Sequence, residues 1–314
     1  MQENDNIAEQ AIRQKSVQHR PVYRSRQSYA LGRMGGRTLL YLIVALGAAA
    51  SMLPFFWTVV SSGKTIAELY RYPPTFWPES PQFVANYVEV WNVVPFGRWM
   101  VNTTWVTVWA FLGGTLSSAI VAYGFSRFRF PGRELFFFVT LATMMLPVEV
   151  TLIPTYLLFN KLRWLDTYYP LIMPFWLGGG AFNIFLMRQF MLGIPVDLDE
   201  AAKIDGASSW RVLWQIILPL CKPALATLAT LGFIANWNNF LGPLIFLKTE
   251  SKYTVAVGLR YLQSAVAGGS AVVSRPQDHL LMAAALMVAL PCLILFFVGQ
   301  KYFVQGIVTT GIKG

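Results

Sequence analysis

Residues 197–223 read DLDEAAKIDGASSWRVLWQIILPLCKP, and this stretch predicts two short helices joined by a tight turn. Three acids stand where the first helix would begin, Asp197, Asp199 and Glu200, and carboxylates are favourable at the positive N-terminal end of a helix. Gly206 predicts the end of that helix, because glycine tolerates the left-handed conformation that terminates helices.

The second helix of this stretch would be capped by Ser208 or Ser209. Its apolar side chains recur at i, i+3, i+4 and i+7, the spacing of one helical face: Trp210, Leu213, Trp214 and Ile217. Pro219 and Pro223 predict its end. The stretch therefore predicts a rigid, amphipathic helix-turn-helix, and on pattern alone a helix lying against a bilayer fits equally well.

The chain around this stretch is too apolar for a soluble globule. Of 314 residues, 55% are hydrophobic and 13% are charged, whereas a soluble domain carries about 25% charged residues. Six stretches are nearly free of charge and reach the roughly 20 residues that a membrane-crossing helix needs: 38–60, 100–125, 135–159, 168–187, 223–247 and 280–300. We expect an all-α polytopic membrane protein with about six transmembrane helices and the helix-turn-helix between the fourth and fifth.

The orientation follows from the Lys and Arg residues, which are retained on the cytoplasmic side. The side that holds both termini and the helix-turn-helix collects 16 of them, and the other side collects 9. Both termini are therefore predicted to be cytoplasmic. Two sizeable segments would lie outside, at 61–99 and 248–279, and either could meet a soluble partner.

The domain organisation has two parts. Residues 1–37 form a basic tail with seven Lys and Arg residues and no acid after residue 10. This tail lacks aromatic side chains spaced to stack on bases, so anionic lipid headgroups explain its charge better than nucleic acid does. Residues 38–314 form the transmembrane domain, which includes the helix-turn-helix segment at 195–222.

The helix-turn-helix resembles the EAA motif of ABC importer permeases. The resemblance rests on Glu200-Ala201-Ala202, then Gly206 after three residues, Ile216 after nine more, and Leu218-Pro219 after one. It extends over 38–314 and is strongest to the maltose-permease type of carbohydrate importer. Supporting pieces are Leu146-Pro147 with Pro154 and Tyr156, Asn236-Trp237-Asn238-Asn239-Phe240, and the ending Gln300 to Gly306 followed by Lys313-Gly314.

This resemblance implies a permease subunit in a bacterial inner membrane that carries a di- or oligosaccharide, with a glycerol-phosphate ester as the alternative cargo. The implied partners are two ATP-binding subunits, a second permease chain or another copy of this one, and an extracytoplasmic solute-binding protein. ATP and Mg²⁺ would be bound by the ATPase subunits, and this chain would bind no cofactor or metal and catalyse no reaction. The implied ATPase-coupling residues are Glu200, Ala201, Ala202, Asp205, Gly206, Trp210, Trp214 and Pro219.

The translocation path is harder to locate in the sequence. Glu149 is the acid well inside an apolar run, and a charge within a membrane is costly enough to indicate function. Sugars are held by aromatic faces and amides, so the further candidates are Trp176, Asn183, Asn236, Trp237, Asn238 and Asn239. Hydrogen bonds between helices would explain the same asparagines.

Other classes of protein fit the sequence less well. Gly63-Lys64-Thr65 resembles the end of a phosphate-binding loop, but the glycine required five positions earlier is Thr58. A membrane enzyme is disfavoured because the two histidines, His19 and His279, form no metal or catalytic motif. A secondary transporter is disfavoured because the two halves of the chain show no repeat. Cys221 and Cys292 suggest packing residues rather than a disulfide.

Overall fold

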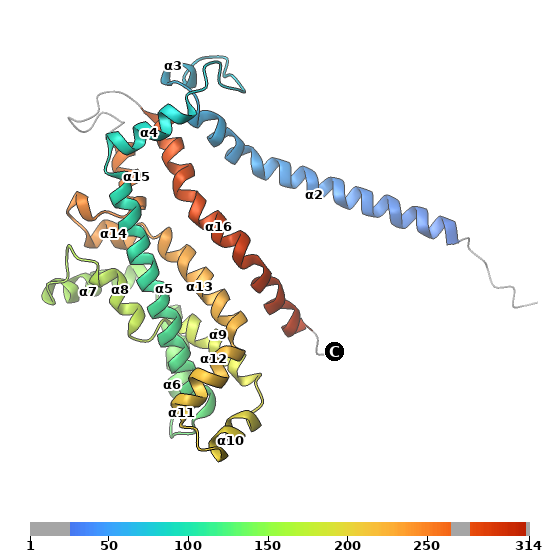
Figure 1. Ribbon diagram of the computed structural model, residues 1–314, viewed down its shortest axis with the longest axis vertical. Helices are drawn as coiled ribbons and strands as arrows, with labels where there is room; N and C mark the ends of the chain where they lie inside the picture. Colours follow the sequence, from blue (N-terminus) through green and yellow to red (C-terminus); the bar gives the residue numbers. More distant parts are fainter. Residues whose placement is uncertain (1–25, 265–276, 312–314) are drawn as a thin grey trace, which may run out of the picture. The chain divides into compact units, whose positions relative to one another are not determined.

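The computed structural model describes residues 26–264 and 277–311, and the surroundings of side chains at 37–263 and 277–300. Over these ranges the chain is helical, with no strand, as expected for an all-α membrane protein (Figure 1). It divides into two compact units, Met1–Trp57 and Thr58–Gly314. The elements are α2 (Arg26–Ser62), α3 (Ile66–Leu69), α4 (Phe83–Val93), α5 (Phe96–Arg127), α6 (Arg133–Ala142), η1 (Thr143–Met145), α7 (Val148–Lys161), α8 (Tyr169–Trp176), α9 (Ala181–Leu192), α10 (Asp197–Ile204), α11 (Ser209–Val212), η2 (Leu213–Ile217), α12 (Leu218–Leu220), α13 (Lys222–Trp237), α14 (Leu241–Phe246), η3 (Glu250–Lys252), α15 (Val255–Ser264) and α16 (Asp278–Gly311).

Four stretches of these helices are long and apolar enough to cross a membrane: Arg37–Ser62, Phe96–Arg127, Tyr169–Leu192 and Asp278–Gln300. Two bent helix pairs also qualify if each pair is one span, Arg133–Met145 with Val148–Lys161 and Ser209–Leu220 with Lys222–Trp237. The described residues thus contain four to six candidate spans, in agreement with the expected six.

Three of the expected spans are interrupted rather than continuous. The stretch predicted at 135–159 is bent by 100° between its two helices, where Leu146 is extended ahead of Pro147, because a residue before proline disfavours helical geometry. The stretch at 168–187 breaks between α8 and α9, and the stretch at 223–247 breaks between α13 and α14. Apolar composition predicted where the spans lie but not these breaks.

Helix α5 is the centre of the second unit. It packs against α8, α9 and α13, and α13 in turn packs against α16, as the ribbon view shows for α5, α13 and α16 (Figure 1). The approach of α5 to the break before α9 is very close. A Cβ on Gly179 would lie 2.3 Å from the carbonyl oxygen of Gly114 and 2.7 Å from Cβ of Ser118, and Gly179 has a φ of +72°. Only glycine fits this position without displacing α5.

Asp166 ties together two of the connections that are predicted to lie outside. Its carboxylate accepts hydrogen bonds from the backbone N–H groups of Lys248 and Thr249, each at 3.0 Å, and from the Thr249 hydroxyl at 2.7 Å. Lys252 Nζ lies 2.8 Å from Asp166 Oδ2. Burial acts to raise the pKa of Asp166, but the hydrogen bonds from Lys252, Lys248 and Thr249 outweigh it and hold the pKa well below its usual value.

We expect Asp166→Asn to lower the free energy of unfolding by about 1 kcal/mol at pH 7, because it removes a charge-assisted network and leaves donors unpaired. Since the folded-state pKa is depressed, the carboxylate stabilises the fold fully above its unfolded-state pKa of about 3.9 and loses this effect as the pH falls toward the folded-state pKa. Thermal unfolding of the purified protein at pH 7 and pH 3 should therefore show a difference from the native chain that shrinks at pH 3.

Glu79→Gln is the matched control for this substitution. Glu79 pairs with Arg71 at 2.8 Å, but both side chains are more than half exposed, at 59% and 56%, and exposed pairs contribute about 0–1 kcal/mol. An equal effect of both substitutions at pH 7 would contradict the special role of the Asp166 network.

Candidate coupling site

The first helix of the predicted helix-turn-helix is α10, which ends in a backbone cap centred on Gly206. Gly206 has a φ of +80°, and its N–H donates to the carbonyl of Lys203 at 3.0 Å, while the Ala207 N–H donates to the carbonyl of Ala202 at 2.9 Å. This pair of bonds is the Schellman arrangement that closes a helix through a left-handed residue. The predicted helix stop at Gly206 is confirmed.

The second helix begins at Ser208, whose side chain accepts a hydrogen bond from the Arg211 N–H at 3.3 Å. Of the two serines proposed as caps, Ser208 is the cap. The helix then passes through a π-helical turn, η2, and continues through Pro219 to Leu220. The chain bends by 79° between this helix and α13, so the helix ends before the fifth span as predicted. Pro219 lies inside the helix rather than at its end, and Pro223 lies in the first turn of α13.

The predicted single apolar stripe along this second helix is wrong. Leu213 and Ile217 are buried, whereas Trp210 and Trp214 are 58% and 41% exposed. In a π-helical turn each residue advances less far around the axis than in an α-helix, so the face that packs inward shifts along the chain. The two tryptophans contact each other edge to face, with ring centroids 5.7 Å apart.

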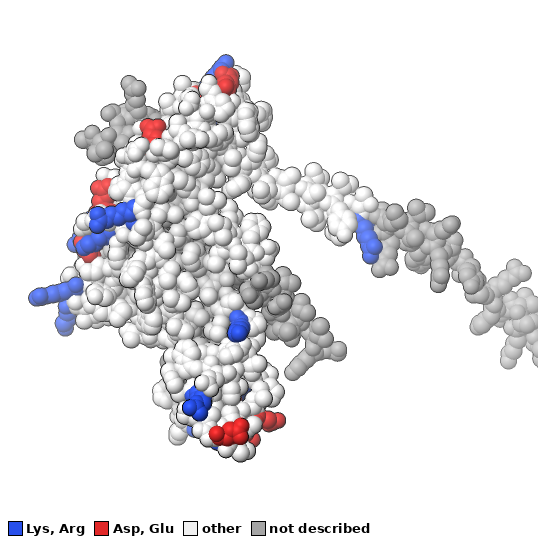
Figure 2. Space-filling model, in the orientation of Figure 1, with Lys and Arg blue, Asp and Glu red and all other residues white. Residues whose placement is uncertain are grey.

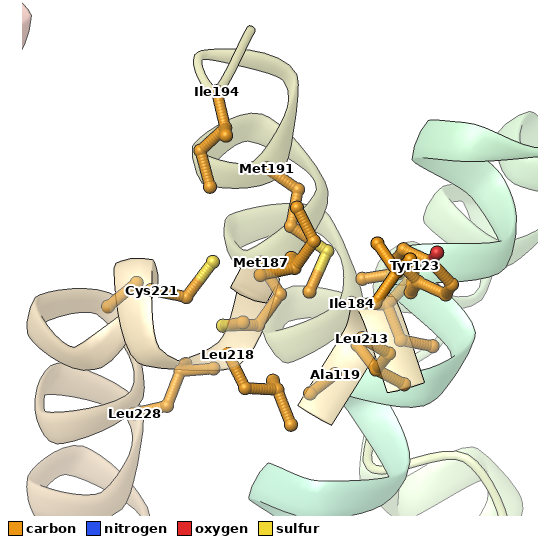
Figure 3. Close-up of a cluster of buried hydrophobic side chains, with 14 of the residues drawn as sticks. Ala119, Tyr123, Ile184, Met187, Met191, Ile194, Leu213, Leu218, Cys221 and Leu228 are labelled. Carbon is orange, nitrogen blue, oxygen red and sulfur yellow. The ribbon is translucent and has the colours of Figure 1, made fainter. Parts of the chain in front are cut away.

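The buried side of the second helix anchors the segment to the membrane-spanning helices. It contributes to one apolar cluster with the inner-facing residues of α5 and α9, drawn in Figure 3. The cluster contains Ala119, Ala122, Tyr123, Phe137, Ile184, Met187, Met191, Ile194, Val212, Leu213, Ile217, Leu218, Cys221, Ala224 and Leu228. Displacing the second helix would therefore expose a large apolar area, which ties its position to that of α5 and α9.

The other side of the segment is exposed. Glu200, Ala201 and Asp205 lie at the surface of α10 and its turn, and Ile204 is 87% exposed. In Figure 2, charged side chains gather at the end of the second unit that carries α10, and most of the surface over the long helices is uncharged. A helix that is rigidly capped, exposed and both acidic and apolar is suited to docking on another protein.

Two buried arginines near this segment were not predicted from the sequence. Arg127, the last residue of α5, lies with its Nε 2.7 Å from Asp199 Oδ2, and Arg188 of α9 lies 3.3 Å from Glu134 and 4.1 Å from the centre of the Phe137 ring. From the sequence, the helix dipole alone accounts for an acid at 199. An arginine at the end of an apolar run is the only signal the sequence offered for such a pair.

The candidate residues for the translocation path differ in their surroundings. Glu149 is exposed in the first turn of α7, and the Trp176 indole N–H donates to the carbonyl of Trp109 at 3.0 Å. Trp237 is 2% exposed, and its indole N–H donates to the carbonyl of Val288 at 3.0 Å. Trp237, the last residue of α13, therefore packs against α16.

The asparagine candidates lie at the breaks in the spans. Asn183, Asn236 and Asn238 each donate to the carbonyl four residues earlier in the chain, at 2.7, 2.8 and 2.8 Å. The Asn239 side chain accepts from the Gly242 N–H at 3.2 Å. These hydrogen bonds are local, but Asn238 Nδ2 also donates to Cys292 Sγ of α16 at 3.9 Å. The alternative of hydrogen bonding between helices therefore holds at Asn238.

A further feature of the spans that the sequence analysis missed is the unwound segment between α8 and α9. Gly178, Gly179 and Gly180 all have positive φ, and this run of three glycines was the available signal. Irregular backbone within a membrane span is tolerated where it is buried in protein or lines a cavity. Gly179 is buried and Gly180 is exposed.

A family of transport proteins shares the sequence of these helices. The family model described as "Binding-protein-dependent transport system inner membrane component" matches residues 114–309, more than half of the chain. The chain belongs to this family. The match covers the helix-turn-helix, all of α9 and α5 from residue 114 onward, so the segment at 195–222 is part of a transport permease.

Similar proteins span nearly the whole permease. It is 30% identical over 278 residues to the arabinooligosaccharides transport system permease protein AraQ of Halalkalibacterium halodurans. This alignment covers 88% of the permease and 96% of AraQ. It is 32% identical over 283 residues to the sn-glycerol-3-phosphate transport system permease protein UgpE of Yersinia pestis, with 88% and 97% covered.

Solved structures of ABC transporters share this fold. A chain of a bacterial ABC transporter involved in the import of the acidic polysaccharide alginate superposes with a TM-score of 0.75 at 28% identity, covering 90% of the permease and all of that chain. A second chain, from the alginate transporter in complex with a pentasaccharide-bound periplasmic protein, shares the fold with a TM-score of 0.56 at 16% identity. The permease is thus a multi-pass inner-membrane subunit of an ABC transporter.

Proposed function

We propose that the permease forms the translocation path of an ATP-driven importer and that α10 docks on a separate ATPase subunit. The observation that carries this proposal is the shape of the segment at 195–222. One side of it is fixed in the apolar cluster with α5 and α9, and the other side presents exposed Glu200, Ala201 and Asp205. A rigid body held by the membrane helices and free on its outer face can pass a movement from a docked partner to the spans.

The coupling residues have distinct roles in this proposal. Glu200 offers a carboxylate to a basic side chain of the ATPase subunit, and small Ala201 and Ala202 allow its close approach. Gly206 sets the turn, with Asp205 beside it. Trp210 and Trp214 form an exposed aromatic pair that can bury apolar area against the partner, and Pro219 lies in the last turn of the second helix, next to the bend into α13. ATP and Mg²⁺ belong to the partner.

The proposed cargo is a di- or oligosaccharide delivered by an extracytoplasmic binding protein. The named cargo of AraQ supports this class, and the named cargo of UgpE supports the alternative, a glycerol-phosphate ester. The path would be lined at the breaks in the spans by Glu149, Trp176, Asn183, Asn236, Asn238 and Asn239, with Trp237 supporting them from the helix packing.

The proposed assembly has two permease chains, either two different chains or two copies of this one, two ATPase subunits and the binding protein. Both termini would lie in the cytoplasm, as would the segment at 195–222, and the connections tied by Asp166 would lie outside. Residues 1–37 would form the cytoplasmic tail, most of which lies outside the described residues, as do residues 265–276 of the second outer segment.

The test is purification of the complex through a tag on this chain, followed by reconstitution into liposomes. We expect ATPase subunits to copurify, and we expect ATP hydrolysis to be stimulated by the binding protein with its sugar. Titration with arabinooligosaccharides and with sn-glycerol-3-phosphate separates the two cargo classes. Uptake driven by an ion gradient, with no ATPase subunit bound, would contradict the proposal and favour a secondary transporter.

A further inference from the structure

A buried ion pair connects α10 to the membrane-spanning helix α5. Arg127 Nε and Asp199 Oδ2 are 2.7 Å apart, and the two side chains are 5% and 4% exposed. The same guanidinium donates through Nη2 to the carbonyl of Ile194 at 3.0 Å. One arginine therefore holds both α10 and the connection that leads into it.

The helix dipole does not explain why Asp199 is buried. Asp197 and Glu200 stand in the same first turn of α10 and are exposed, so they supply the favourable negative charge at that end from the solvent. Asp199 is 3% exposed. An acid turned away from water toward one arginine has a specific partner.

Stability of the fold does not explain the pair either. Taking two charges out of water carries a desolvation penalty that their attraction does no more than offset, and an apolar pair of similar volume is often as stable or more stable. The atoms here are also not ideally satisfied. Although Nε is close to Oδ2, it is not aligned for a hydrogen bond, and Asp199 Oδ1 has no hydrogen-bond partner among the described residues.

The remaining explanation is geometric. The apolar cluster holds the second helix of the segment through Val212, Leu213 and Ile217, and apolar contacts are non-directional. Helix α10 contributes only partly buried Ala202 to that cluster. Of the ion pairs between residues that the structure describes, Arg127–Asp199 alone joins α10 to a membrane-spanning helix.

We propose that Arg127 and Asp199 are positioning residues that pass the movement of α10 directly to α5, so that ATP hydrolysis and transport remain coupled. This inference rests on the proposed function, in which α10 docks on the ATPase subunit. It assigns α5, which packs on α8, α9 and α13, as the helix that receives the movement first. The arginine's second contact, to Ile194, keeps α10 from rotating about the ion pair.

The test measures cargo transported per ATP hydrolysed, in liposomes that contain the complete purified complex with its binding protein. Asp199→Asn keeps the shape of the side chain and removes its charge, and Arg127→Gln removes the other partner. For each variant we expect ATPase subunits to copurify at the native level and ATP hydrolysis to stay within about twofold. Transport per ATP should fall at least about fivefold.

Arg133→Gln is the matched control, because Arg133 also forms an ion pair, with Glu134 at 2.7 Å, but is 30% exposed and bridges no helix to α10. We expect it to leave transport per ATP unchanged. A double variant with Arg127→Met and Asp199→Leu controls for misfolding, because an apolar pair is compatible with folding. If this double variant is as thermally stable as the native chain, its transport per ATP should still fall.

The outcomes separate the two proposals. If Asp199→Asn, or a stable double variant with Arg127→Met and Asp199→Leu, transports as much cargo per ATP as the native chain, the role of the ion pair is overturned. The proposed importer function is not affected by that result. If Asp199→Asn and Arg127→Gln both lose thermal stability, hydrolysis and transport in parallel, and the double variant with Arg127→Met and Asp199→Leu restores all three, the ion pair serves folding alone and the proposal is also overturned. A native complex without ATP-driven transport would overturn the proposed function itself.

Discussion

Combining Glu200→Ala with Gly206→Pro is expected to reduce ATP-driven uptake by the permease at least tenfold and to weaken copurification of the ATPase subunits. Gly206 has a φ of +80°, whereas proline fixes φ near −65°. Proline also removes the N–H that donates to the Lys203 carbonyl. The turn cannot close as it does in the native chain, and this costs about 3 kcal/mol or more locally. The measurement is uptake and ATP hydrolysis by the reconstituted complex.

Gly193→Ala is the control for this pair of substitutions, since Gly193 precedes α10 and has an ordinary helical conformation with a φ of −75°. An added Cβ there would lie 3.3 Å from the Phe190 carbonyl oxygen, a contact that a small shift relieves. We expect uptake within about twofold of native. Full activity of the Glu200 and Gly206 variant would mean that α10 does not dock on the ATPase subunit.

Gly179→Val is expected to prevent the second unit from folding to its native structure. Its added Cβ would lie 2.3 Å from the Gly114 carbonyl oxygen on α5, and the residue would have to adopt a φ of +72°. The steric conflict is with backbone, so a side-chain rearrangement cannot relieve it. We expect a loss of more than about 3 kcal/mol, seen as aggregation on size-exclusion chromatography or as a strongly lowered unfolding temperature.

Substitutions at two further glycines separate the two causes of the expected effect of Gly179→Val, which are backbone strain and steric conflict with α5. Gly180 has a φ of +90° and no atom within 4 Å of an added Cβ, so Gly180→Ala should cost only the backbone strain, about 1–3 kcal/mol. Gly124, inside α5, has neither constraint, and Gly124→Ala should stabilise by up to about 1 kcal/mol. Equal stability of all three variants would contradict the close packing of α5 on the break before α9.

The sequence predicted the features of this permease that depend on neighbouring residues. Gly206 ends α10 because a helix stop is a local property of the backbone, and Ser208 caps the next helix for the same reason. The apolar runs predicted the spans because crossing a membrane requires a minimum length of uncharged helix.

Features that depend on distant contacts escaped prediction. Asp199 and Arg127 are 72 positions apart, so the charge pattern could not reveal that one faces the other. The predicted stripe of Trp210, Leu213, Trp214 and Ile217 assumed α-helical periodicity, which the π-helical turn breaks. The role of Asp166 depends on a connection more than eighty residues away.

The π-helical turn at Leu213–Ile217 has a consequence for how the two sides of the segment are set against each other. Such a turn behaves as an α-helix with one surplus residue, and each residue of an α-helix advances the direction of its side chain by about 100°. Deleting one residue within the turn would leave both helices intact but rotate everything before it by that angle. The surplus residue thus sets the angular phase between Trp210, which faces outward, and Ile217, which stays in the apolar cluster.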